Sequence, residues 1–374
     1  MQVFLDRQGR AAGLATLLAG LARESKTAAV MVLSAAGNNL QEPAEAAALT
    51  ALLRDFPKPL FGGIFPQLVY GDERLLRGTI VVALPVAAEI TVIDELSNPA
   101  VDFDLALAGL AGAGEECTWL IFLDGFSRRI AALVEAMLVN LGCNHHFIGG
   151  GAGSLTLKSQ PCLFNNQGFL ADAALLVKLP LPGGVGVAHG WEIISDSFKV
   201  TEASFTSLQT LDWRPAFEVY REAVAAHCDC LPTPDNFFEI AKAYPFGIGK
   251  FGAEVVVRDP LMVGEGGALV CVGEIPEGSF VHILHGRPDS LVAAAGLAKQ
   301  RAEASFPGQR ADWLLLIDCI SRVLFLADDF GRELAAIRDH RPLIGALTIG
   351  EIANSGLDCL EFYNKTVVVG AFGE

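Results

Sequence analysis

The sequence predicts an α/β protein of the α+β kind, in which mixed β-sheets are covered by helices and a strand-helix-strand-hairpin unit is repeated. Short β-branched or aromatic runs bounded by Gly, Pro or Asn favour strands, and Leu- and Ala-rich segments with a period of 3.6 favour helices. The same order of elements recurs along the chain. Of the 374 residues, 52% are hydrophobic and 19% are charged, so the chain can bury a large core, and disorder is excluded as its main state.

The first element expected is a helix near the N-terminus. Ala11–Ala22 is an Ala- and Leu-rich run, for which a secretory signal peptide is the alternative interpretation. Asp6 stands where a signal peptide is basic, and the polar residues 23–26 follow the run directly. We therefore predict an amphipathic helix within residues 1–27.

A weak copy of the repeat comes next. It starts with the apolar residues 28–33, continues through the helical segment Ala44–Phe56 and the run Pro59–Gly63, and ends in the apolar strand Thr79–Leu84. Each copy predicts a strand, a helix, a second strand and a hairpin-like return.

Two clearer copies begin at Trp119–Arg128 and Trp313–Arg322, which share Trp, Leu, Asp, Ser and Arg in one register. Both should be strands that end in an Asp-x-x-Ser-Arg sequence at the start of a helix, a sequence that the weak copy lacks. The matched elements that follow are helices Ile130–Leu141 and Leu324–Ile337, and strands that reach a glycine at 147–149 and 343–345. The Phe- and Asn-containing segments 164–166 and 362–364 then lead to the strands Ala173–Leu179 and Thr366–Phe372.

The region between the two clear copies is interrupted by Pro and Gly at 182–184, at 231–234 and at Pro260. Ala216–His227 has the spacing of a helix that closes one half of the chain. We place a domain boundary near Pro215. The predicted division is an N-terminal helix at residues 1–27, an N-terminal domain at 28–215 and a C-terminal domain at 216–374.

The composition excludes two classes of partner. The chain has 27 Lys and Arg against 43 Asp and Glu, a formal net charge of −16, and no basic stripe that could bind a nucleic-acid backbone. The strongest apolar runs, such as Thr79–Ala88, fall short of the roughly 18 residues that a membrane-spanning helix needs. We expect a soluble protein with no nucleic-acid partner and no membrane insertion.

Eight cysteines are scattered over the chain without the dense spacing of a small secreted scaffold. We therefore expect reduced thiols and a cytoplasmic location. The cysteines are residues 117, 143, 162, 228, 230, 271, 319 and 359.

Motifs spread along most of the chain carry a family resemblance. They are Ile148–Gly153, Val187–Trp191 followed by Val200-Thr201, Asp318–Arg322, Gly350–Ile352 and Asn364–Thr366. In this order they resemble the FIST family of sensory proteins, which has an N-terminal and a C-terminal part. The resemblance implies a cytoplasmic sensor that binds a small molecule, amino acids being candidates. It does not imply a catalysed reaction. The 27 residues before the first strand are too few for a signalling domain, so we expect the output to run through a separate signalling protein.

The candidate ligand-binding residues come from both domains. They are Asp124, Ser127, Arg128, Gly149, Gly150, Gly151, His189, Asp318, Cys319, Arg322, Gly350, Glu351, Asn364 and Thr366. The resemblance brings Arg322, Glu351 and Asn364 together from three stretches of the last copy. They offer a cation, an anion and an amide, which could hold the backbone of an amino acid, so we predict that they line one pocket.

The two Asp-x-x-Ser-Arg sequences have two interpretations. At the junction of a strand and a helix, free backbone amides and a guanidinium suit an anionic ligand. Alternatively, each Asp caps its helix and each Arg forms a structural ion pair. Glu351 could likewise meet a ligand ammonium or pair with Arg322.

The sequence favours neither a nucleotide site nor a metal site. The run Gly149–Gly153 is followed by a strand-like segment at 155–157 and not by a helix, so it predicts a tight turn or a ligand-lining loop and not a nucleotide site. The cluster His227–Cys230 and the pair His282 and His285 lack zinc-site spacing, and no metal or other cofactor is predicted.

Three functions remain open. The first is the ligand-binding sensor. The second is a hydrolase or transferase that uses Cys319, whose pKa Arg322 and a helix N-terminus could lower. The third is an interaction scaffold without a ligand. Beside His189, Trp191 could stack on a ligand or fill the core.

Overall fold

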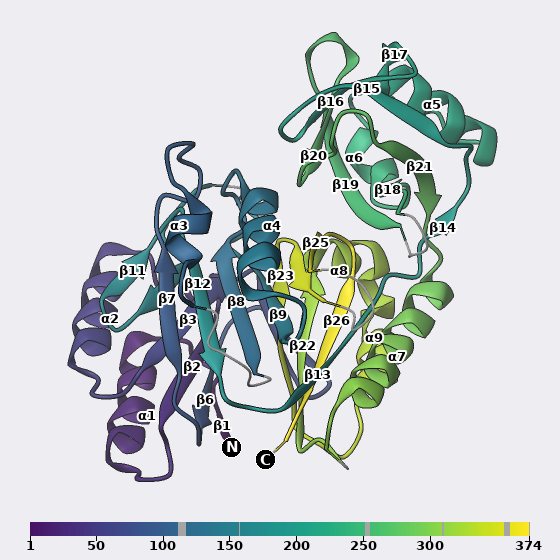
Figure 1. Cartoon of the computed structure of the whole chain (residues 1–374). Coiled ribbons are helices and arrows are strands. Elements are labelled where there is room, and N and C mark those ends of the chain that lie inside the picture. Colours follow the sequence, from purple (N-terminus) through teal and green to yellow (C-terminus); the bar gives the residue numbers. More distant parts are fainter. Residues whose placement is uncertain (111–116, 157, 251–254, 309, 355–359, 374) are drawn as a thin grey trace.

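The computed structural model describes residues 1–110, 117–156, 158–250, 255–308, 310–354 and 360–373 (Figure 1). The described residues form three six-stranded sheets and one eight-stranded sheet, with helices packed on them. The mixed α and β architecture predicted from the sequence is confirmed.

The three six-stranded sheets are called sheets 1, 2 and 3, in the order in which their central strands occur along the chain. Sheet 1 has the order β1 (Gln2–Asp6), β6 (Thr79–Leu84), β2 (Ala29–Ala35), β3 (Leu60–Phe65), β10 (Leu163–Asn165), β11 (Gly168–Leu170). Sheet 2 has the order β25 (Glu361–Tyr363), β24 (Glu351–Ala353), β9 (His146–Ala152), β8 (Thr118–Asp124), β12 (Ala174–Leu179), β7 (Glu89–Ile93). Sheet 3 has the order β13 (Gly183–Ala188), β26 (Val367–Phe372), β22 (Trp313–Cys319), β23 (Leu343–Thr348), β4 (Gln67–Tyr70), β5 (Glu73–Leu75).

All three sheets share one design. The central strand pairs in parallel with the strand that follows its helix, as β2 with β3, β8 with β9 and β22 with β23. The returning strand β6, β12 or β26 pairs antiparallel on its other side. The chain therefore contains three repeats: repeat 1 at residues 2–84, repeat 2 at 89–179, and repeat 3 at 183–188 and 288–372.

Each repeat gives its hairpin to the sheet of another repeat. The hairpin β4–β5 of repeat 1 extends sheet 3, β24–β25 of repeat 3 extends sheet 2, and β10–β11 of repeat 2 extends sheet 1. The exchange closes on itself, so every six-stranded sheet needs two repeats to be complete.

Helices cover the outer faces of the sheets. Two of them begin with proline at the first helical position, where its missing N–H costs no hydrogen bond. The helix after β8 ends at Gly142, whose φ of 76° suits glycine. The helices are α1 (Ala11–Arg23) and α2 (Pro43–Asp55) in repeat 1, α3 (Phe103–Leu107) and α4 (Ile130–Leu141) in repeat 2, and α7 (Pro288–Ser305), α8 (Ile320–Leu326) and α9 (Phe330–Ile337) in repeat 3. Short 3₁₀ turns lie at Ala36–Asn38, Glu265–Gly267 and Ala327–Asp329.

The inner faces of the three sheets share one core. Because side chains alternate along a strand, Leu120 and Phe122 of β8 face this shared core, whereas Trp119 and Ile121 pack with the helix α4. Residues of β2 and β22, such as Met31 and Leu315, lie in the same shared core.

A separate unit enters repeat 3 between β13 and α7. This inserted subdomain, residues 192–285, contains the eight-stranded sheet and lies above the repeats in Figure 1. The predicted boundary at Pro215 falls inside this sheet, because strands from both sides of it pair with one another. The subdomain consists of β14 (Glu192–Ile193), β15 (Phe198–Ser204), β16 (Ser207–Leu211), β17 (Arg214–Pro215), α5 (Ala216–His227), α6 (Phe237–Ala241), β18 (Phe246–Ile248), β19 (Val256–Val263), β20 (Leu269–Val272) and β21 (Phe280–His285).

Two local expectations need correction. The first 27 residues contain α1 but also the strand β1, which pairs with β6 and makes this segment part of sheet 1. Residues Gly149–Gly151 do not form a turn or loop, because they are central residues of β9 and pair with β8 on one side and, at Gly149 and Gly150, with β24 on the other.

No helix among the described residues is both long enough and apolar enough to cross a membrane.

Candidate functional site

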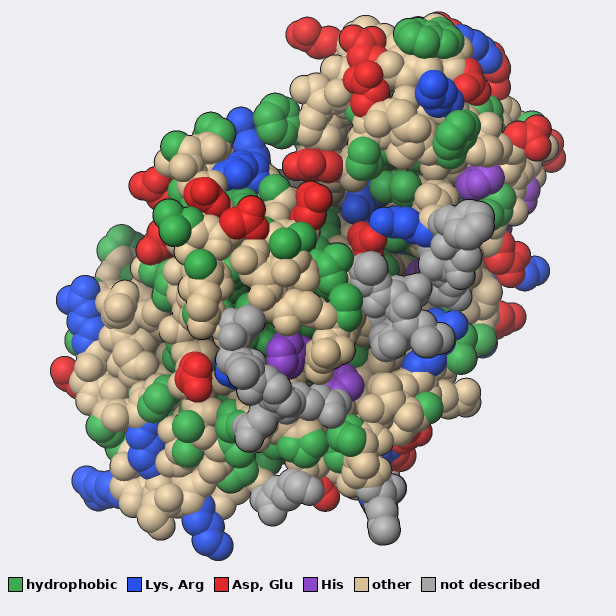
Figure 2. All heavy atoms as spheres, viewed as in Figure 1, with side chains coloured by type: hydrophobic (Ala, Val, Ile, Leu, Met, Phe, Trp, Pro, Cys, Tyr) green, Lys and Arg blue, Asp and Glu red, His purple; other side chains and the backbone are tan. Residues whose placement is uncertain are grey.

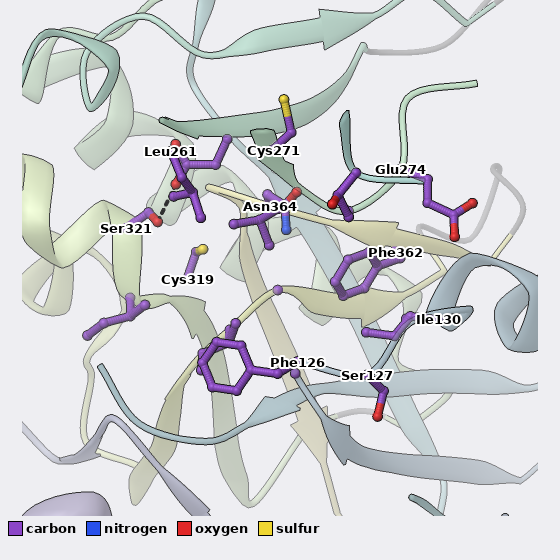
Figure 3. Close-up of a pocket in the computed structure, with 18 of the residues that line it drawn as sticks. Phe126, Ser127, Ile130, Leu261, Cys271, Glu274, Cys319, Ser321, Phe362 and Asn364 are labelled. Carbon is purple, nitrogen blue, oxygen red and sulfur yellow. Dashed lines mark hydrogen bonds between the residues drawn. The ribbon is translucent and has the colours of Figure 1, made fainter. Parts of the chain in front are cut away.

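A cavity of about 720 Å³ lies between repeats 2 and 3 and the inserted subdomain. The hollow between the subdomain and the repeats is visible in Figure 2, and its walls are drawn in Figure 3. The loop after β8 and the start of α4 form one side, β22, α8 and the hairpin β24–β25 form another, and β19 and β20 of the subdomain close it. This volume falls in the usual range for small-molecule sites.

The two Asp-x-x-Ser-Arg sequences, one in repeat 2 and one in repeat 3, both lie at this cavity. Asp124 is the last residue of β8, and Asp318 is the penultimate residue of β22. A helix follows at Ile130 or Ile320, so the prediction that both Asp residues end a strand before a helix is confirmed. The C-terminal ends of parallel strands commonly surround the ligand site of such sheets.

The walls of the cavity are mainly apolar. Phe126 and Phe362 lie inside, and Phe205 and Phe238 of the subdomain stand at the rim with 64% and 41% of their surface exposed. Large exposed apolar side chains around a concave site favour a ligand that covers them.

A buried ion pair joins the subdomain to repeat 3 beside the cavity. Asp259 of β19 lines the cavity, is 2% exposed and accepts a hydrogen bond of 2.5 Å from the Ser321 hydroxyl. Its other oxygen lies 3.1 Å from Lys365 Nζ, which also donates to the Lys242 carbonyl. The charge of Asp259 is therefore balanced from the repeat 3 side.

Asn364 supplies the one cavity-lining side-chain oxygen that is buried without a hydrogen-bond partner among the described residues. The residue is 1% exposed, and its Nδ2 donates to the Tyr363 carbonyl at 3.0 Å. Figure 3 shows the Asn364 side chain among the cavity-lining residues. An unpaired buried acceptor costs free energy, so a donor from a ligand would be stabilised here.

Cys319 also lines the cavity, but its thiol is held in the neutral form. The residue is 3% exposed, and burial together with the nearby Glu351 and Asp259 carboxyls raises its pKa well above the ordinary value. None of the described cavity-lining residues is a histidine. Arg322 interacts electrostatically with the thiol, but burial outweighs it, so the pKa is not lowered as the sequence-based hypothesis expected.

Arg322 is not available to a ligand. It is fully buried, donates to Glu333 at 2.9 Å and lies 3.2 Å from Asp318. Burial beside Glu333 raises the pKa of Asp318 well above its usual range. Neither Arg322 nor Asp318 lines the cavity, so the predicted pocket of Arg322, Glu351 and Asn364 does not form, and the ion-pair interpretation holds for this copy of the motif.

Arg322 instead holds three backbone segments together. Its guanidinium donates to the carbonyls of His189, Leu291 and Lys365. These carbonyls belong to the segment that enters the subdomain, to α7 and to the turn before β26. Arg322 therefore positions the turn that carries Asn364.

Glu351 and Thr366 lie behind the cavity wall. Glu351 is fully buried, accepts hydrogen bonds from the Thr348 hydroxyl and the Thr366 amide, and burial raises its pKa to about 8. Thr366 is 1% exposed and donates to the Asn364 carbonyl. Gly350 does line the cavity, with a φ of 80°, and a Cβ there would lie 2.3 Å from the Phe362 ring.

The predicted glycines Gly149, Gly150 and Gly151 do not line the cavity. A Cβ on Gly149 would lie 1.8 Å from the Ile121 carbonyl oxygen, and one on Gly151 would lie 2.1 Å from the Ile349 carbonyl oxygen. Gly149 therefore permits the close approach of the neighbouring strand β8, and Gly151 that of the segment between β23 and β24.

The motif in repeat 2 has a different arrangement. Asp124 is 1% exposed and accepts hydrogen bonds from the amides of Phe126 and Asp172, so it fixes the loop backbone. Ser127 lines the cavity but donates to Asp172 at 2.7 Å, and Arg128 is exposed at the rim.

His189 and Trp191 are structural in this fold. The His189 ring accepts a hydrogen bond from the Trp191 amide at 2.9 Å, and neither residue lines the cavity. Trp191 is 4% exposed, donates to the Lys365 carbonyl and packs against Phe325. The core interpretation of Trp191 is the one that the structure supports.

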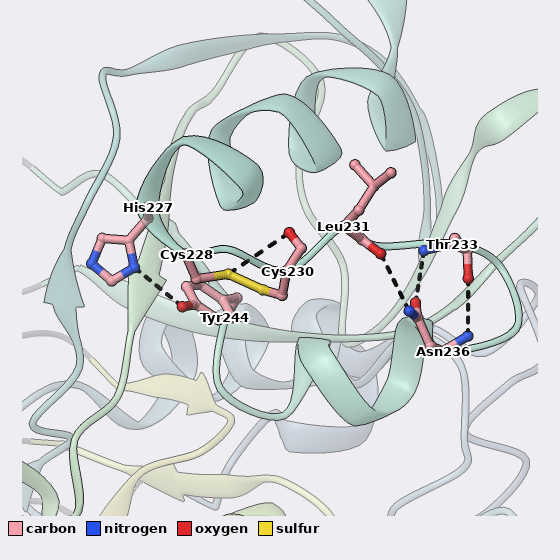
Figure 4. Close-up of a disulfide and its surroundings, with 7 residues drawn as sticks. All are labelled: His227, Cys228, Cys230, Leu231, Thr233, Asn236 and Tyr244. Atoms are coloured by element: carbon pink, nitrogen blue, oxygen red, sulfur yellow. Dashed lines mark hydrogen bonds between the residues drawn. A yellow bond between two sulfur atoms is a disulfide. The ribbon is translucent and has the colours of Figure 1, made fainter.

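The cysteines include one pair that departs from the expectation of reduced thiols. Cys228 and Cys230, just after α5, form a disulfide (Figure 4). The neighbouring His227 ring hydrogen-bonds to the Tyr244 hydroxyl. Among the described residues no three His, Cys, Asp or Glu side chains gather as a metal site, and Cys359 lies outside these residues.

Sequence reasoning missed the part of the site that the subdomain supplies. Asp259, Leu261 and Phe238 line the cavity but lie in a region without a repeated counterpart. The internal repeat was the signal that located the other walls, and it is absent from residues 192–285.

Comparison with known families divides the chain into two consecutive parts. The FIST N domain family matches residues 15–214, and the FIST C domain family matches residues 216–354. No curated protein matches the chain.

Proposed function

Because the chain belongs to the FIST family, whose domains are associated with sensory signalling, we propose that it is a sensor that binds a small molecule in the cavity between repeats 2 and 3 and the inserted subdomain. One observation carries this proposal: the cavity holds the buried, unpartnered Oδ1 of Asn364. Such an oxygen is stabilised when a ligand donates to it.

The position of the cavity supports a sensory role. Its walls belong to two units of the chain, and a ligand between them would contact β19 and β20 on one side and repeat 3 on the other. Binding energy that depends on both walls favours the closed arrangement over an open one. A partner protein could then detect the ligand by recognising the position of the subdomain relative to the repeats.

The proposal includes the finer expectations from the resemblance. The ligand is a small metabolite, amino acids being family candidates, and the output passes to a separate signalling protein in the cytoplasm. We propose a binding and not a catalytic role, which the raised pKa of Cys319 and the lack of a histidine among the described cavity-lining residues support.

Mass spectrometry of the small molecules that copurify with the full chain tests the proposal. The matched variants are Leu261→Trp, which fills the cavity, and Leu76→Trp, which adds the same ring at an exposed site remote from it. We expect a compound bound to the wild type and to Leu76→Trp but absent from Leu261→Trp. A compound retained equally by all three proteins would place its site elsewhere.

The other two functions predict different results. A thiol enzyme requires Cys319 to react with a thiol reagent near neutral pH, and the exposed Cys143 serves as the internal positive control. We expect Cys143 to react and Cys319 to stay unmodified until the protein unfolds. A scaffold without a ligand would show no copurifying compound and no melting shift with any amino acid.

A further inference from the structure

We propose that the part of the ligand that enters this cavity is uncharged and largely apolar, and that it carries an N–H or O–H group that donates to Asn364 Oδ1. This inference rests on the proposed binding function and names the ligand class. It differs from the expectation of a free amino acid, whose carboxylate and ammonium would both have to be accommodated.

The orientation of the Asn364 amide is fixed by its neighbours. Nδ2 donates to the Tyr363 carbonyl at 3.0 Å, and a reversed amide would bring two oxygens together at this place. Oδ1 is therefore the atom left for a ligand, and it has no donor among the described residues. An acceptor with this geometry selects a ligand that carries a hydrogen-bond donor.

Buried cations near the cavity are already engaged. Arg322 is paired with Glu333 and Asp318, and Lys365 is paired with Asp259. Arg258 is 5% exposed and donates to three backbone carbonyls, those of Val257, Glu274 and Phe362. A ligand carboxylate placed deep in the cavity would therefore lose its water without gaining a cation.

The carboxyl groups at this end of the sheets do not favour a ligand cation either. Asp259 is already bonded to Ser321 and Lys365. Glu351 lies behind Gly350 and is largely protonated near neutral pH, because burial raises its pKa to about 8. The charged side chains that remain, Arg128 and Glu274, lie at less buried positions of the lining.

The aromatic lining matches a planar apolar ligand. Phe126, Phe362, Phe205 and Phe238 come from both units of the chain, and apolar area removed from water stabilises the bound state by roughly 25 cal/mol per Å². Aromatic rings add favourable edge-to-face and stacked contacts.

Three probes with one ring skeleton test the inference by fluorescence titration of the full chain. N-phenyl-1-naphthylamine is neutral, apolar and has one N–H. Its N-methyl derivative lacks the donor, and 8-anilinonaphthalene-1-sulfonate adds a negative charge. We expect the neutral amine to bind best, the N-methyl derivative about two- to tenfold more weakly, as for one lost hydrogen bond, and the sulfonate more weakly than the neutral amine.

Two variants connect these differences to Asn364. Asn364→Ala should lower the affinity for the neutral amine to that of the N-methyl derivative and leave the N-methyl derivative unaffected. Asn354→Ala is the matched control, because Asn354 is also buried but both its amide atoms bond to backbone, at Phe147 and His145, and it does not line the cavity. The control should lower stability and leave probe affinity at the wild-type value.

The outcomes separate this inference from the proposed function. Probe binding that is lost in Leu261→Trp but equal for the three probes, or unchanged in Asn364→Ala, would overturn the ligand class and keep the cavity as the binding site. A second result would lead to the same conclusion: the wild type binds no neutral probe, and free amino acids raise its melting temperature but not that of Leu261→Trp. Equal probe binding by the wild type and Leu261→Trp would count against both. If Asn364→Ala does not fold, the comparison of the neutral amine with its N-methyl derivative on the wild type decides.

Discussion

Repeats 2 and 3 contain the same Asp-x-x-Ser-Arg sequence and use it in different ways. In repeat 2, Asp124 fixes a loop and Arg128 is exposed at the rim of the cavity. In repeat 3, Asp318 and Arg322 are fully buried together with Glu333. Identical residues at identical spacing therefore do not imply identical contacts.

A register difference of one residue explains the contrast. β8 and β22 both have seven residues, and they begin at Thr118 and Trp313, so the structure aligns Asp124 with Cys319 and not with Asp318. A shift by one residue moves side chains to the opposite face of a strand. Trp119 accordingly packs on the helix side, whereas Trp313 faces the shared core and lies against Phe372.

The connection to the helix also differs. Five residues separate β8 from α4, whereas α8 begins directly after β22. Arg322 therefore lies in the first turn of α8, close enough to pair with Asp318 at the end of β22, while Arg128 lies in an irregular loop. The comparison teaches that strand register and loop length decide which copy forms an ion pair.

The largest expected difference concerns the two arginines. Arg322→Met leaves the Asp318 and Glu333 carboxyls buried without their cation and should lower the free energy of unfolding by about 3–5 kcal/mol, whereas Arg128→Met should change it by less than about 0.5 kcal/mol. Urea denaturation of both variants measures this. Arg322→Lys should also melt earlier than the wild type, because a single ammonium cannot reproduce the several hydrogen bonds of the guanidinium. Equal losses for both arginines would contradict the comparison.

The second expected difference concerns a contact between a carboxyl group and a thiol, which both repeats contain. The end of the central strand supplies the thiol in repeat 3 and the carboxyl group in repeat 2. Glu351 interacts with the Cys319 thiol, and Asp124 with that of Cys162. Since burial raises the pKa of Glu351 to about 8, the folded protein binds the proton more tightly than the unfolded chain, and stability present below about pH 4.5 is lost as pH rises towards 8.

Glu351→Gln tests this difference because it cannot ionise. It should remove up to about 4 kcal/mol of the stability loss between pH 5 and pH 8. Thermal melts of the wild type and the variant across this range measure it. The same pH dependence in both proteins would show that Glu351 is not the group that titrates.

The smallest expected difference concerns the two serines. Ser321 donates to Asp259 of the subdomain, whereas Ser127 donates to Asp172 within its own repeat. Each Ser→Ala change should cost about 1–2 kcal/mol, but only Ser321→Ala loosens the attachment of the subdomain. Limited proteolysis should therefore cut near residues 189–191 and 286–287 faster in Ser321→Ala alone. Similar cutting in both variants would mean that this hydrogen bond does not hold the subdomain.

Local periodicity predicted most of the helices closely, but the expected helix Leu324–Ile337 is divided into α8 and α9 by the 3₁₀ turn Ala327–Asp329. Ile130–Leu141 and Ala216–His227 were expected with the bounds that the structure has, because their apolar spacing and end residues act within a few turns. The order of strands in the repeats followed from the same local patterns. The location of the motif copies at strand ends followed as well.

What the sequence could not indicate depends on contacts between distant segments. The strand role of Gly149–Gly151 requires β24, and the hairpin exchange requires pairing between different repeats. The cavity wall at Asp259 depends on where the subdomain lies, and the one-residue offset between Trp119 and Trp313 depends on pairing with β12 and β26. In the sequence itself the two tryptophans align.

The hairpin exchange has a consequence for synthesis of the protein on the ribosome. Tyr70 of β4 pairs with Ile344 of β23, so a nascent chain that has emerged through repeat 2 holds β4 and β5 without their sheet partner. Repeats 1 and 2 each leave a strand edge, at β3 and β9, that only a later segment can cover, and unpaired strand edges invite association with other chains. Sheet 1 can be completed once β10 and β11 have emerged, whereas sheets 2 and 3 must wait for the strands of repeat 3. The ring of repeats should therefore form late and cooperatively, unlike a solenoid that can grow one repeat at a time.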